Sequence, residues 1–279
     1  MKKISRRSFL AAAGLSVAAL ALTACGGSSS SVASSVASSA ASSEAASTSA
    51  AAGELTTVEA GKLTMATNAT FPPYEMTTDA GEFEGIDIET AQAIADKLGL
   101  ELQIDDMDFD AALLSVQQGK ADIVMAGVTV TDERKAVMDF SDSYATGIQS
   151  IIVPEGSDIA SPDDLAGKKI GTQRGTTGYI YCSDDFGDDN VVAYDDGLTA
   201  VQALNNGQVD AVVIDNAPAQ EFVAANPGLK ILDTSYAEED YAIGMAKGSS
   251  LEDAVNAALK ELKADGTLQS IVDKYITAE

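Results

Sequence analysis

Four short segments of polar residues hold the side chains in this sequence that could do chemistry. Each follows a run of residues predicted to form a β-strand, and the segments comprise residues 68–75, 127–134, 174–178 and 215–216. In open α/β sheets a ligand binds outside the carboxyl ends of the strands. We therefore expect these segments to surround a binding site, in which their charged and hydroxyl groups could hold a small polar molecule.

The absence of histidine limits the chemistry of this site. The chain has no histidine and only two cysteines, Cys25 and Cys182. Zinc sites, a Ser-His-Asp triad and a Cys-His dyad are therefore excluded, and a metal could be held only by oxygen ligands. We expect neither a metal nor a cofactor. A general acid or base would have to be a carboxylate, a lysine, a tyrosine or the thiol of Cys182, and none is obviously placed for catalysis.

The elements that must position these segments alternate between strand and helix. The predicted order is strand 63–67, helix 88–98, strand 100–104, helix 110–118 and strand 121–126. This β-α-β-α-β order is typical of a parallel sheet. A second unit of the same kind is predicted from strands near residues 169–172, 191–194 and 210–214. Residues 206–213 also echo residues 118–125, because in each a helix is closed by glycine and followed by a buried strand.

The chain is predicted to cross twice between two lobes. Amphipathic helices at residues 251–263 and 267–275 follow a strand-like run at 241–245, which suggests a return to the first lobe. Crossings near residues 148–153 and 239–245 would form a two-strand hinge, an arrangement suited to closure around a small molecule. Lobe one would then comprise residues 54–147 plus 246–279, and lobe two residues 148–245 including the hinge strands.

The first 53 residues are predicted to export and anchor the protein. Residues 1–24 combine a basic start with an apolar stretch too short to span a bilayer, as in a signal peptide. Arg6 and Arg7 resemble a twin-arginine export motif, although an ordinary signal with two extra arginines remains open. The segment ending at Cys25 resembles a lipobox, in which that cysteine is lipidated. Residues 25–53, which are rich in serine and alanine after Cys25, would be a disordered tether at the extracytoplasmic face of the membrane.

The charge of the protein argues against nucleic acid as a partner. The net charge is −26, and removal of residues 1–24, which hold four basic residues and no acidic one, would make it −30. A surface this acidic repels nucleic acid and mainly favours solubility. It does not define the ligand, because a pocket can differ in charge from the whole surface.

The segments after the strands resemble the extracellular solute-binding proteins of family 3, which deliver polar amino acids to ABC importers. The resemblance is carried by the segments at 68–75, 127–134 and 174–178, by Asp215-Asn216 and by residues 85–89, and it covers residues 60–276. It implies a two-lobed α/β fold of the type II periplasmic-binding class, each lobe a mostly parallel sheet flanked by helices. The implied partners are a free amino acid and the permease subunits of an ABC transporter, and the protein is expected to be a monomer.

The resemblance also implies a role for individual residues. Arg134 would bind the α-carboxylate of the ligand, because a planar guanidinium meets a carboxylate bidentately. Asp215, on the other lobe, would bind the α-ammonium. Thr129, the backbone of Gly127 and the Thr177 amide would complete the hydrogen bonds of the carboxylate. Phe71 and Phe109 would lie on either side of the ligand's side chain, and Asn68 would also line the binding site.

Plainer interpretations of these residues remain open. Arg134 could be a solvated basic residue in the first turn of a helix capped by Thr131. Asp215 could be the N-cap of the helix that follows it, and aromatic residues at strand ends often belong to the core. Tyr74 and Glu75 match the family but are more typical of structural residues than of ligand contacts.

Departures from the family bear on the ligand. Relatives that bind cationic amino acids often have aspartate where this chain has Asn68, so a basic ligand would lack that partner. Gln173 and Ile214 replace residues that glutamine-binding relatives use, and Thr90 departs from the family signature outside the cleft. The sequence therefore favours a polar or neutral amino acid without fixing which one.

Two other functions are compatible with the same scaffold. One is a dehydratase-like enzyme, which would need a tuned acid or base in the cleft. The other is an amino-acid sensor, which would usually be fused to a transmembrane signalling segment. An importer's binding protein, and not an enzyme, is the interpretation we expect.

Overall fold

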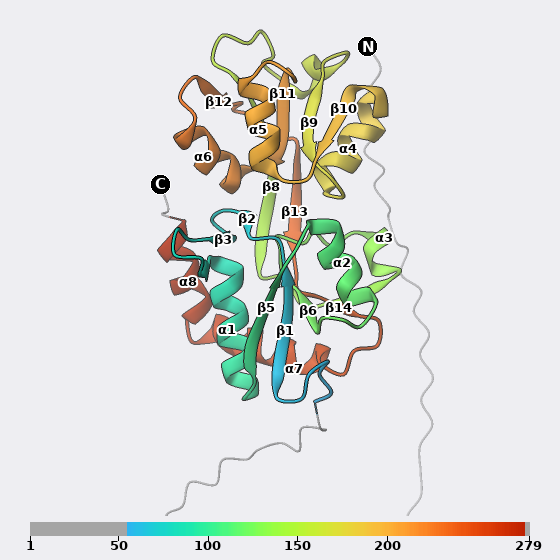
Figure 1. The fold of residues 1–279 in the computed structure, drawn as a ribbon, viewed down its shortest axis with the longest axis vertical. Coiled ribbons are helices and arrows are strands. Elements are labelled where there is room, and N and C mark those ends of the chain that lie inside the picture. Colours follow the sequence, from blue (N-terminus) through green and yellow to red (C-terminus); the bar gives the residue numbers. More distant parts are fainter. Residues whose placement is uncertain (1–54, 277–279) are drawn as a thin grey trace, which may run out of the picture. The chain divides into compact units, whose positions relative to one another are not determined.

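Two mixed β-sheets organise the part of the chain that the structure describes, residues 55–276 of this computed structural model (Figure 1). We call each sheet with its helices a lobe. The predicted signal peptide and tether, with Cys25, lie outside the described residues.

Lobe one contains the first sheet, in the strand order β5-β1-β6-β14-β7. Strand β1 is parallel to β5 and β6, whereas β14 is antiparallel to β6 and β7, so the sheet is mixed. A small antiparallel sheet, β2-β3-β4, lies in the same lobe. The elements are β1 (Lys62–Thr67), β2 (Thr70–Phe71), β3 (Glu75–Thr77), β4 (Phe83–Glu84), α1 (Ile86–Leu98), β5 (Glu101–Asp106), α2 (Phe109–Gln117), β6 (Ile123–Val124), α3 (Asp132–Lys135), β7 (Met138–Phe140), β14 (Gly244–Ala246), α7 (Glu252–Ala264) and α8 (Thr267–Tyr275).

Lobe two contains the second sheet, in the order β10-β9-β11-β8-β12, with β13 also paired to β8. Strand β9 is parallel to β10 and β11, and β8 is antiparallel to its neighbours. The elements are β8 (Ala145–Pro154), the 3-10 helix η1 (Pro162–Leu165), β9 (Ile170–Gln173), α4 (Thr177–Phe186), the 3-10 helix η2 (Asp188–Asn190), β10 (Val191–Tyr194), α5 (Gly197–Asn205), β11 (Ala211–Asp215), α6 (Asn216–Ala225), β12 (Leu229–Ile231) and β13 (Ala237–Tyr241).

Two antiparallel strands, β8 and β13, run side by side between the lobes (Figure 1). Their pairing extends from Ala145 opposite Tyr241 to Gln149 opposite Ala237. The sequence predicted one strand-like run at residues 241–245, but the structure divides it. Tyr241 ends β13 in the sheet of lobe two, whereas Gly244 pairs with Val124 and Phe140 in lobe one. The run is apolar throughout because both of its halves are buried.

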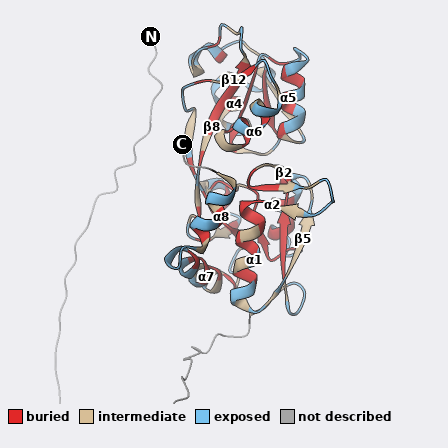
Figure 2. Cartoon of the chain, turned by 90° about the vertical axis from the view of Figure 1, so that its left-hand side faces the viewer, coloured by how far each residue is buried: buried red, intermediate tan, exposed pale blue. Residues whose placement is uncertain are grey.

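The central strands β1 and β11 are buried on both faces, which explains their apolar sequences (Figure 2). In β1, Leu63 and Met65 pack on the side of α1, α7 and α8, whereas Ala66 belongs to the cluster on the side of α2. In β11, Val212 faces α5 and α6, while Val213 faces α4. Side chains alternate along a strand, so a strand covered by helices on both faces needs apolar residues at every position.

The two C-terminal helices return to lobe one, as predicted. Helix α7 packs against α1 and α8, and the buried residues of α7 and α8 share one core with β1. Among residues 55–276, no helix is long and apolar enough to cross a membrane.

Candidate functional site

The ends of four strands and the two connecting strands meet at a cavity between the lobes. It holds about 450 Å³ of space, counting the part open to solvent. All eight predicted ligand-binding residues line it, together with others that the sequence did not single out as ligand contacts. The lining consists of Asn68, Phe71, Glu75, Phe109, Ala126, Gly127, Thr129, Arg134, Gln149, Gln173, Thr176, Thr177, Val213, Ile214, Asp215 and Tyr241.

Arg134 is buried at this cavity and is not a solvated residue. Its backbone amide donates to the hydroxyl of Thr131, which caps helix α3 as predicted (3.2 Å). The guanidinium donates from Nη1 to the carbonyl of Thr129 (2.7 Å) and from Nη2 to the carbonyl of Gly175 in lobe two (3.1 Å). It also lies 5.4 Å from the centre of the Phe109 ring. Two of its five donor hydrogens are therefore used, and three remain for a ligand.

Asp215 lies on the opposite lobe and caps a helix as well as lining the cavity. One carboxylate oxygen accepts from the amide of Ala217 in the first turn of α6 (3.0 Å), and the other from the amide of Ile148 in β8 (2.7 Å). Burial raises the pKa of Asp215 to about 6, although both backbone hydrogen bonds lower it in part. Asp215 therefore caps α6 and also lines the cavity, so its role as a helix cap is compatible with a role in ligand binding.

Hydroxyl groups of the two lobes meet beside Arg134. The hydroxyl oxygens of Thr129 and Thr177 are 3.4 Å apart, and Thr129 also donates to the carboxylate of Glu239 in β13 (3.1 Å). Gln149 in β8 donates to the same carboxylate oxygen (2.9 Å). The connecting strands are thus hydrogen-bonded to the site, and Thr177 presents its backbone amide there as the first residue of α4.

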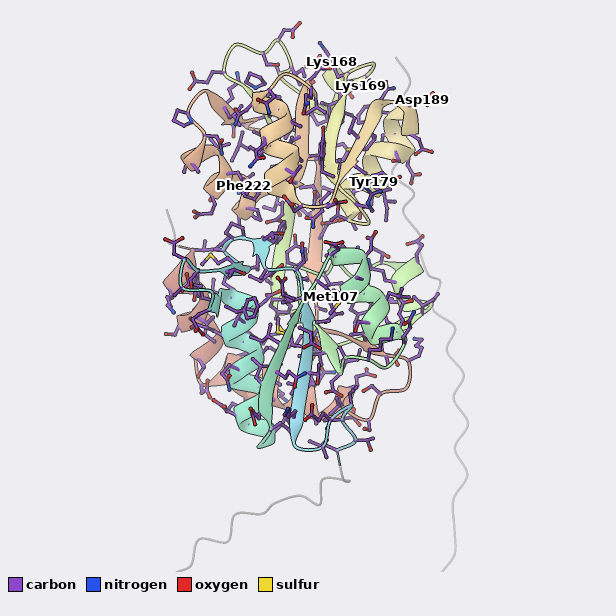
Figure 3. All side chains as sticks on the ribbon, in the orientation of Figure 1. Met107, Lys168, Lys169, Tyr179, Asp189 and Phe222 are labelled. Carbon is purple, nitrogen blue, oxygen red and sulfur yellow. The ribbon has the colours of Figure 1, made fainter. Side chains whose placement is uncertain are left out.

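Asn68 and Gln173 bring the lobes together at another point of the cavity. The side-chain amide of Gln173 donates to the side-chain oxygen Oδ1 of Asn68 (2.8 Å), and the same oxygen accepts from the hydroxyl of Thr70 (3.1 Å). The side-chain amide of Asn68 donates in turn to the backbone carbonyl of Met107 (2.9 Å). Met107 directly follows β5, on the side of lobe one that faces lobe two (Figure 3). Both acceptor positions of the Asn68 side-chain oxygen are therefore used, and one of its two N–H donors remains for a ligand.

Aromatic rings form one wall of the cavity. Phe71 stacks on Tyr74 with their centres 5.9 Å apart, and Tyr74 meets Tyr241 edge-on at 5.4 Å. Gly127 lies against this wall with φ of +54°, and a Cβ there would come within 2.9 Å of the Phe71 ring. Only glycine allows the backbone to approach the ring so closely in this conformation.

Sequence reasoning missed several lining residues. Gln149 and Tyr241 were not identified, Thr176 was included only as part of the segment 174–178, and Glu75 was expected to be structural. The only available signal for Gln149 and Tyr241 was their position on the strands predicted to cross between the lobes. Among residues 55–276 no group of acidic or cysteine side chains is arranged to hold a metal ion.

The sequence of this chain is similar to that of known binding proteins. The sequence profile of the bacterial extracellular solute-binding proteins, family 3, matches residues 63–278. The L-cystine-binding protein TcyJ of Escherichia coli K12 is 34% identical over 226 residues, covering 79% of this chain and 85% of that protein.

Solved structures show the same fold. An ancestral arginine-binding protein bound to glutamine superposes with a TM-score of 0.75 at 42% identity, covering 78% of this chain and 99% of its own. The amino acid ABC transporter substrate-binding protein AbpA of Streptococcus pneumoniae, bound to L-arginine, gives a TM-score of 0.73 at 38% identity, with 77% and 94% covered. The arrangement is therefore the two-lobed, type II periplasmic-binding fold.

Proposed function

Because the chain belongs to the bacterial extracellular solute-binding proteins of family 3, we propose that it captures a free amino acid between its lobes and delivers it to an ABC transporter permease. The observation that carries this proposal is the pairing of one buried cation and one buried anion at a single cavity. Arg134 and Asp215 come from opposite lobes and both line it. An amino acid has the two complementary charges.

The zwitterion would be held across the cleft. The remaining donors of Arg134 and the backbone amide of Thr177 would bind the α-carboxylate. The Thr129 hydroxyl would join them by turning from Glu239 to the ligand, whereas the Gly127 amide stays bonded to Asp87. The carboxylate of Asp215 would bind the α-ammonium, to which the carbonyl of Gly127 could also contribute. Because the two charges are bound by different lobes, closure completes the site, and β8 and β13 would act as the hinge.

The side chain of the ligand would be polar or neutral. Phe71 and Phe109 offer apolar surfaces for it, and Asn68 and Gln173 offer amides in place of a charge. Relatives bind cystine or arginine, and an ancestral arginine-binding protein also holds glutamine, so the family alone does not fix the ligand. The relatives are binding proteins, and we propose that this chain likewise releases its ligand unchanged and without a cofactor.

The anchor and the domain limits complete the proposal. We propose a signal peptide at residues 1–24, lipidation of Cys25 and a tether to residue 53. Lobe one would comprise 54–147 plus 244–279, and lobe two 148–243, because the predicted limit at residue 245 would separate Gly244 and Met245 from their partners in the sheet of lobe one. The protein would act as a monomer at the extracytoplasmic face of the membrane, with permease subunits as partners. Replacement of Cys25 by alanine should leave the protein out of the membrane fraction, and equal membrane retention of the variant would exclude the anchor.

A thermal-shift screen against the twenty amino acids and cystine tests the function. A ligand at 100 times its Kd adds about 2.7 kcal/mol to the stability of the protein, which is readily measured. We expect one or a few polar or neutral amino acids to raise the melting temperature, and Arg134→Ala to remove most of the shift. A screen in which only arginine and lysine stabilise the protein would overturn the ligand class, and one without any hit would overturn the function.

A further inference from the structure

Two acidic residues lie completely buried behind the ligand cavity. Glu75 begins β3, and Asp87 lies in the first turn of α1; both have a relative exposure of 0%. Each side chain shifts the pKa of the other, that of Glu75 upward and that of Asp87 downward. The two segments are also joined by backbone hydrogen bonds, since the amide of Asp87 donates to the carbonyl of Tyr74 (2.8 Å). The fold of lobe one therefore brings these two buried acidic residues together.

The two carboxyl groups lack the donors that two carboxylates would need. Neither oxygen of Glu75, nor Oδ1 of Asp87, accepts a conventional hydrogen bond from any residue among 55–276. A buried carboxylate without partners is strongly disfavoured. A hydrogen bond between two carboxyl groups requires that one of them carry a proton.

The surroundings of the pair are acidic or uncharged. Burial raises the pKa of Glu75 well above its usual value, and the charges of Asp87, Asp106 and Asp215 raise it further. Burial also raises the pKa of Asp87 to about 6, although its hydrogen bonds lower it in part. The hydroxyl groups of Tyr74 and Tyr144 also lie near the pair, and burial raises the pKa of both, which keeps them protonated. Burial and the neighbouring negative charges thus favour a proton on Glu75, whereas the Gly127 amide and the Tyr144 hydroxyl favour the ionised form of Asp87.

The pair is connected to the ligand cavity through Gly127. Oδ2 of Asp87 accepts a hydrogen bond from the Gly127 amide (3.0 Å), and both Gly127 and Glu75 line the cavity. Gly127 adopts a left-handed conformation that brings its backbone against Phe71. The Asp87 carboxylate therefore holds the loop that offers backbone groups to the ligand.

We propose that Glu75 and Asp87 share one proton, so that Glu75 donates a hydrogen bond to Asp87, and Asp87 positions the Gly127 loop at the ligand cavity. Glu75 and Asp87 are thus positioning residues that act through Gly127. The pair has a net charge of −1, and the proton belongs to both groups as a unit. Loss of the proton would leave two adjacent, buried negative charges, which repel each other.

This inference concerns the wall of the proposed site, and it can be tested without a ligand. Infrared spectra of the full chain at neutral pH should show the carbonyl stretch of a protonated carboxylic acid. That band should disappear in Glu75→Gln, whose amide can donate to Asp87 in the same way. A wild-type protein without the band, or a band unchanged in Glu75→Gln, would overturn the proposal.

The pH dependence of stability provides a second test. An unfolded glutamate loses its proton at about pH 4.3, whereas Glu75 in the folded protein keeps it, so the stability of the wild type should fall as the pH rises above that value. Glu75→Gln removes this dependence. The melting temperature of Glu75→Gln relative to wild type should therefore increase between about pH 5 and pH 9, while Glu82→Gln, at an exposed position, should run parallel to wild type. A constant difference for Glu75→Gln would contradict a shared proton.

Two further measurements separate this role from simple packing. Glu75→Leu removes the donor, so it should melt at a lower temperature than Glu75→Gln at every pH. Equal melting temperatures would show that the hydrogen bond is unimportant. Above about pH 7, where Asp87 has lost its own proton, the amide resonance of Gly127 should shift as Glu75 titrates in the wild type and stay constant in Glu75→Gln. A resonance that does not respond while the acid band titrates would disprove the connection to the ligand loop, whether or not the protein binds amino acids.

Discussion

The two lobes share the same order of helix, glycine, aspartate and buried strand, but they differ in the charged residues that line the cavity. In lobe one, Gly119 closes α2 and Asp122 precedes β6; in lobe two, Gly207 and Asp210 occupy the corresponding positions before β11. Both glycines are left-handed, with φ of +66° and +67°. Each aspartate accepts a hydrogen bond from the backbone of a neighbouring segment, Asp122 from Thr64 and Asp210 from Lys169 (both 2.7 Å). The repeated sequence therefore serves the same structural purpose twice.

The residues after the equivalent strands are where the lobes diverge. After β6 the chain leads to Gly127, Thr129 and the buried cation Arg134, whereas β11 ends at the anion Asp215. The arrangement of strands and helices determines which positions reach the cavity. The type of residue at each such position determines which ligand group it can bind. A zwitterion fits this division because neither lobe alone offers both charges.

The largest expected effect comes from removing either charge. Truncating one member of a buried charge pair typically costs about 2 to 5 kcal/mol, so Arg134→Ala should weaken amino-acid binding by about thirtyfold or more. Asp215→Asn should weaken it comparably while preserving the cap of α6, because asparagine is also a good N-cap. Calorimetry with the best amino acid from the screen measures both effects.

Lys135→Ala is the matched control for the arginine variant, because it removes an exposed cation from the adjacent position. It should bind like wild type. Circular dichroism of the ligand-free proteins should show intact folds. Binding within about threefold of wild type for Arg134→Ala or Asp215→Asn, a difference below about 1 kcal/mol, would show that the residue does not hold the ligand.

Substitution of Asp122 and Asp210 tests how much these equivalent aspartates of the two lobes contribute to stability. Asp122 is buried and accepts from the amides of Val58 and Thr64, whereas Asp210 is exposed. Asp122→Ala would leave two backbone donors unpaired, and we expect it to lower the free energy of unfolding by about 2 to 3 kcal/mol. Asp210→Ala should lower it by about 1 kcal/mol, because water can replace the carboxylate. Chemical denaturation measures both, and equal losses would mean that burial does not distinguish the two positions.

Asp215 in lobe two should make amino-acid binding weaker at acidic pH. Burial raises the pKa of Asp215 to about 6. Below that pH the carboxyl is protonated and no longer attracts the ligand's ammonium, so affinity should fall as the pH decreases. Between about pH 7.5 and pH 5 we expect a loss of about tenfold. The same raised pKa has the opposite effect on folding, since its contribution to stability decreases as the pH rises from about 4 to 6.

Binding measured at both pH values in wild type and Asp215→Asn isolates this group. The variant should bind weakly at both, with little change between them. A loss in the variant as large as in wild type would assign the pH dependence to another group, such as Asp87, whose pKa is also raised to about 6.

The fold could be predicted from periodicity to a large extent. Alternating strands and amphipathic helices indicated the two α/β lobes, and the prediction that the C-terminal helices return to lobe one was confirmed. The strand at 121–126 was predicted too long, because regular strand pairing is limited to Ile123–Val124, while the amides of Asp122 and Met125 form single hydrogen bonds to β1 on either side of it. The division of 241–245 between two sheets was not predictable, since a buried run has the same composition in either sheet.

The predicted site residues come mainly from the segments that lie after the strands. The eight predicted residues all lie at the cavity, although their contacts with a ligand remain predictions. Gln149 and Glu75 were missed as lining residues because their exposure to the cavity depends on how strands from distant parts of the sequence are placed. The pairing of Glu75 with Asp87 could not be read from the sequence, which shows two acids twelve residues apart without indicating that both are fully buried.

The smallest expected effect concerns the amide contact that joins the lobes without charge. Gln173 donates to Asn68 across the cleft (2.8 Å), a contact that exists only when the lobes are close together. A neutral hydrogen bond contributes about 0.5 to 1.5 kcal/mol, so Asn68→Ala and Gln173→Ala should each weaken amino-acid binding by a few-fold. In the double variant the losses should not add, because either substitution already removes the same bond, and the coupling energy should be about 1 kcal/mol. Calorimetry of the four proteins with one amino acid completes this cycle, and Gln92→Ala, on the exposed face of α1, is the control. Strictly additive losses would show that the two amides do not meet in the liganded protein, and closure would then depend on the charged pair and on the contacts around Arg134 alone.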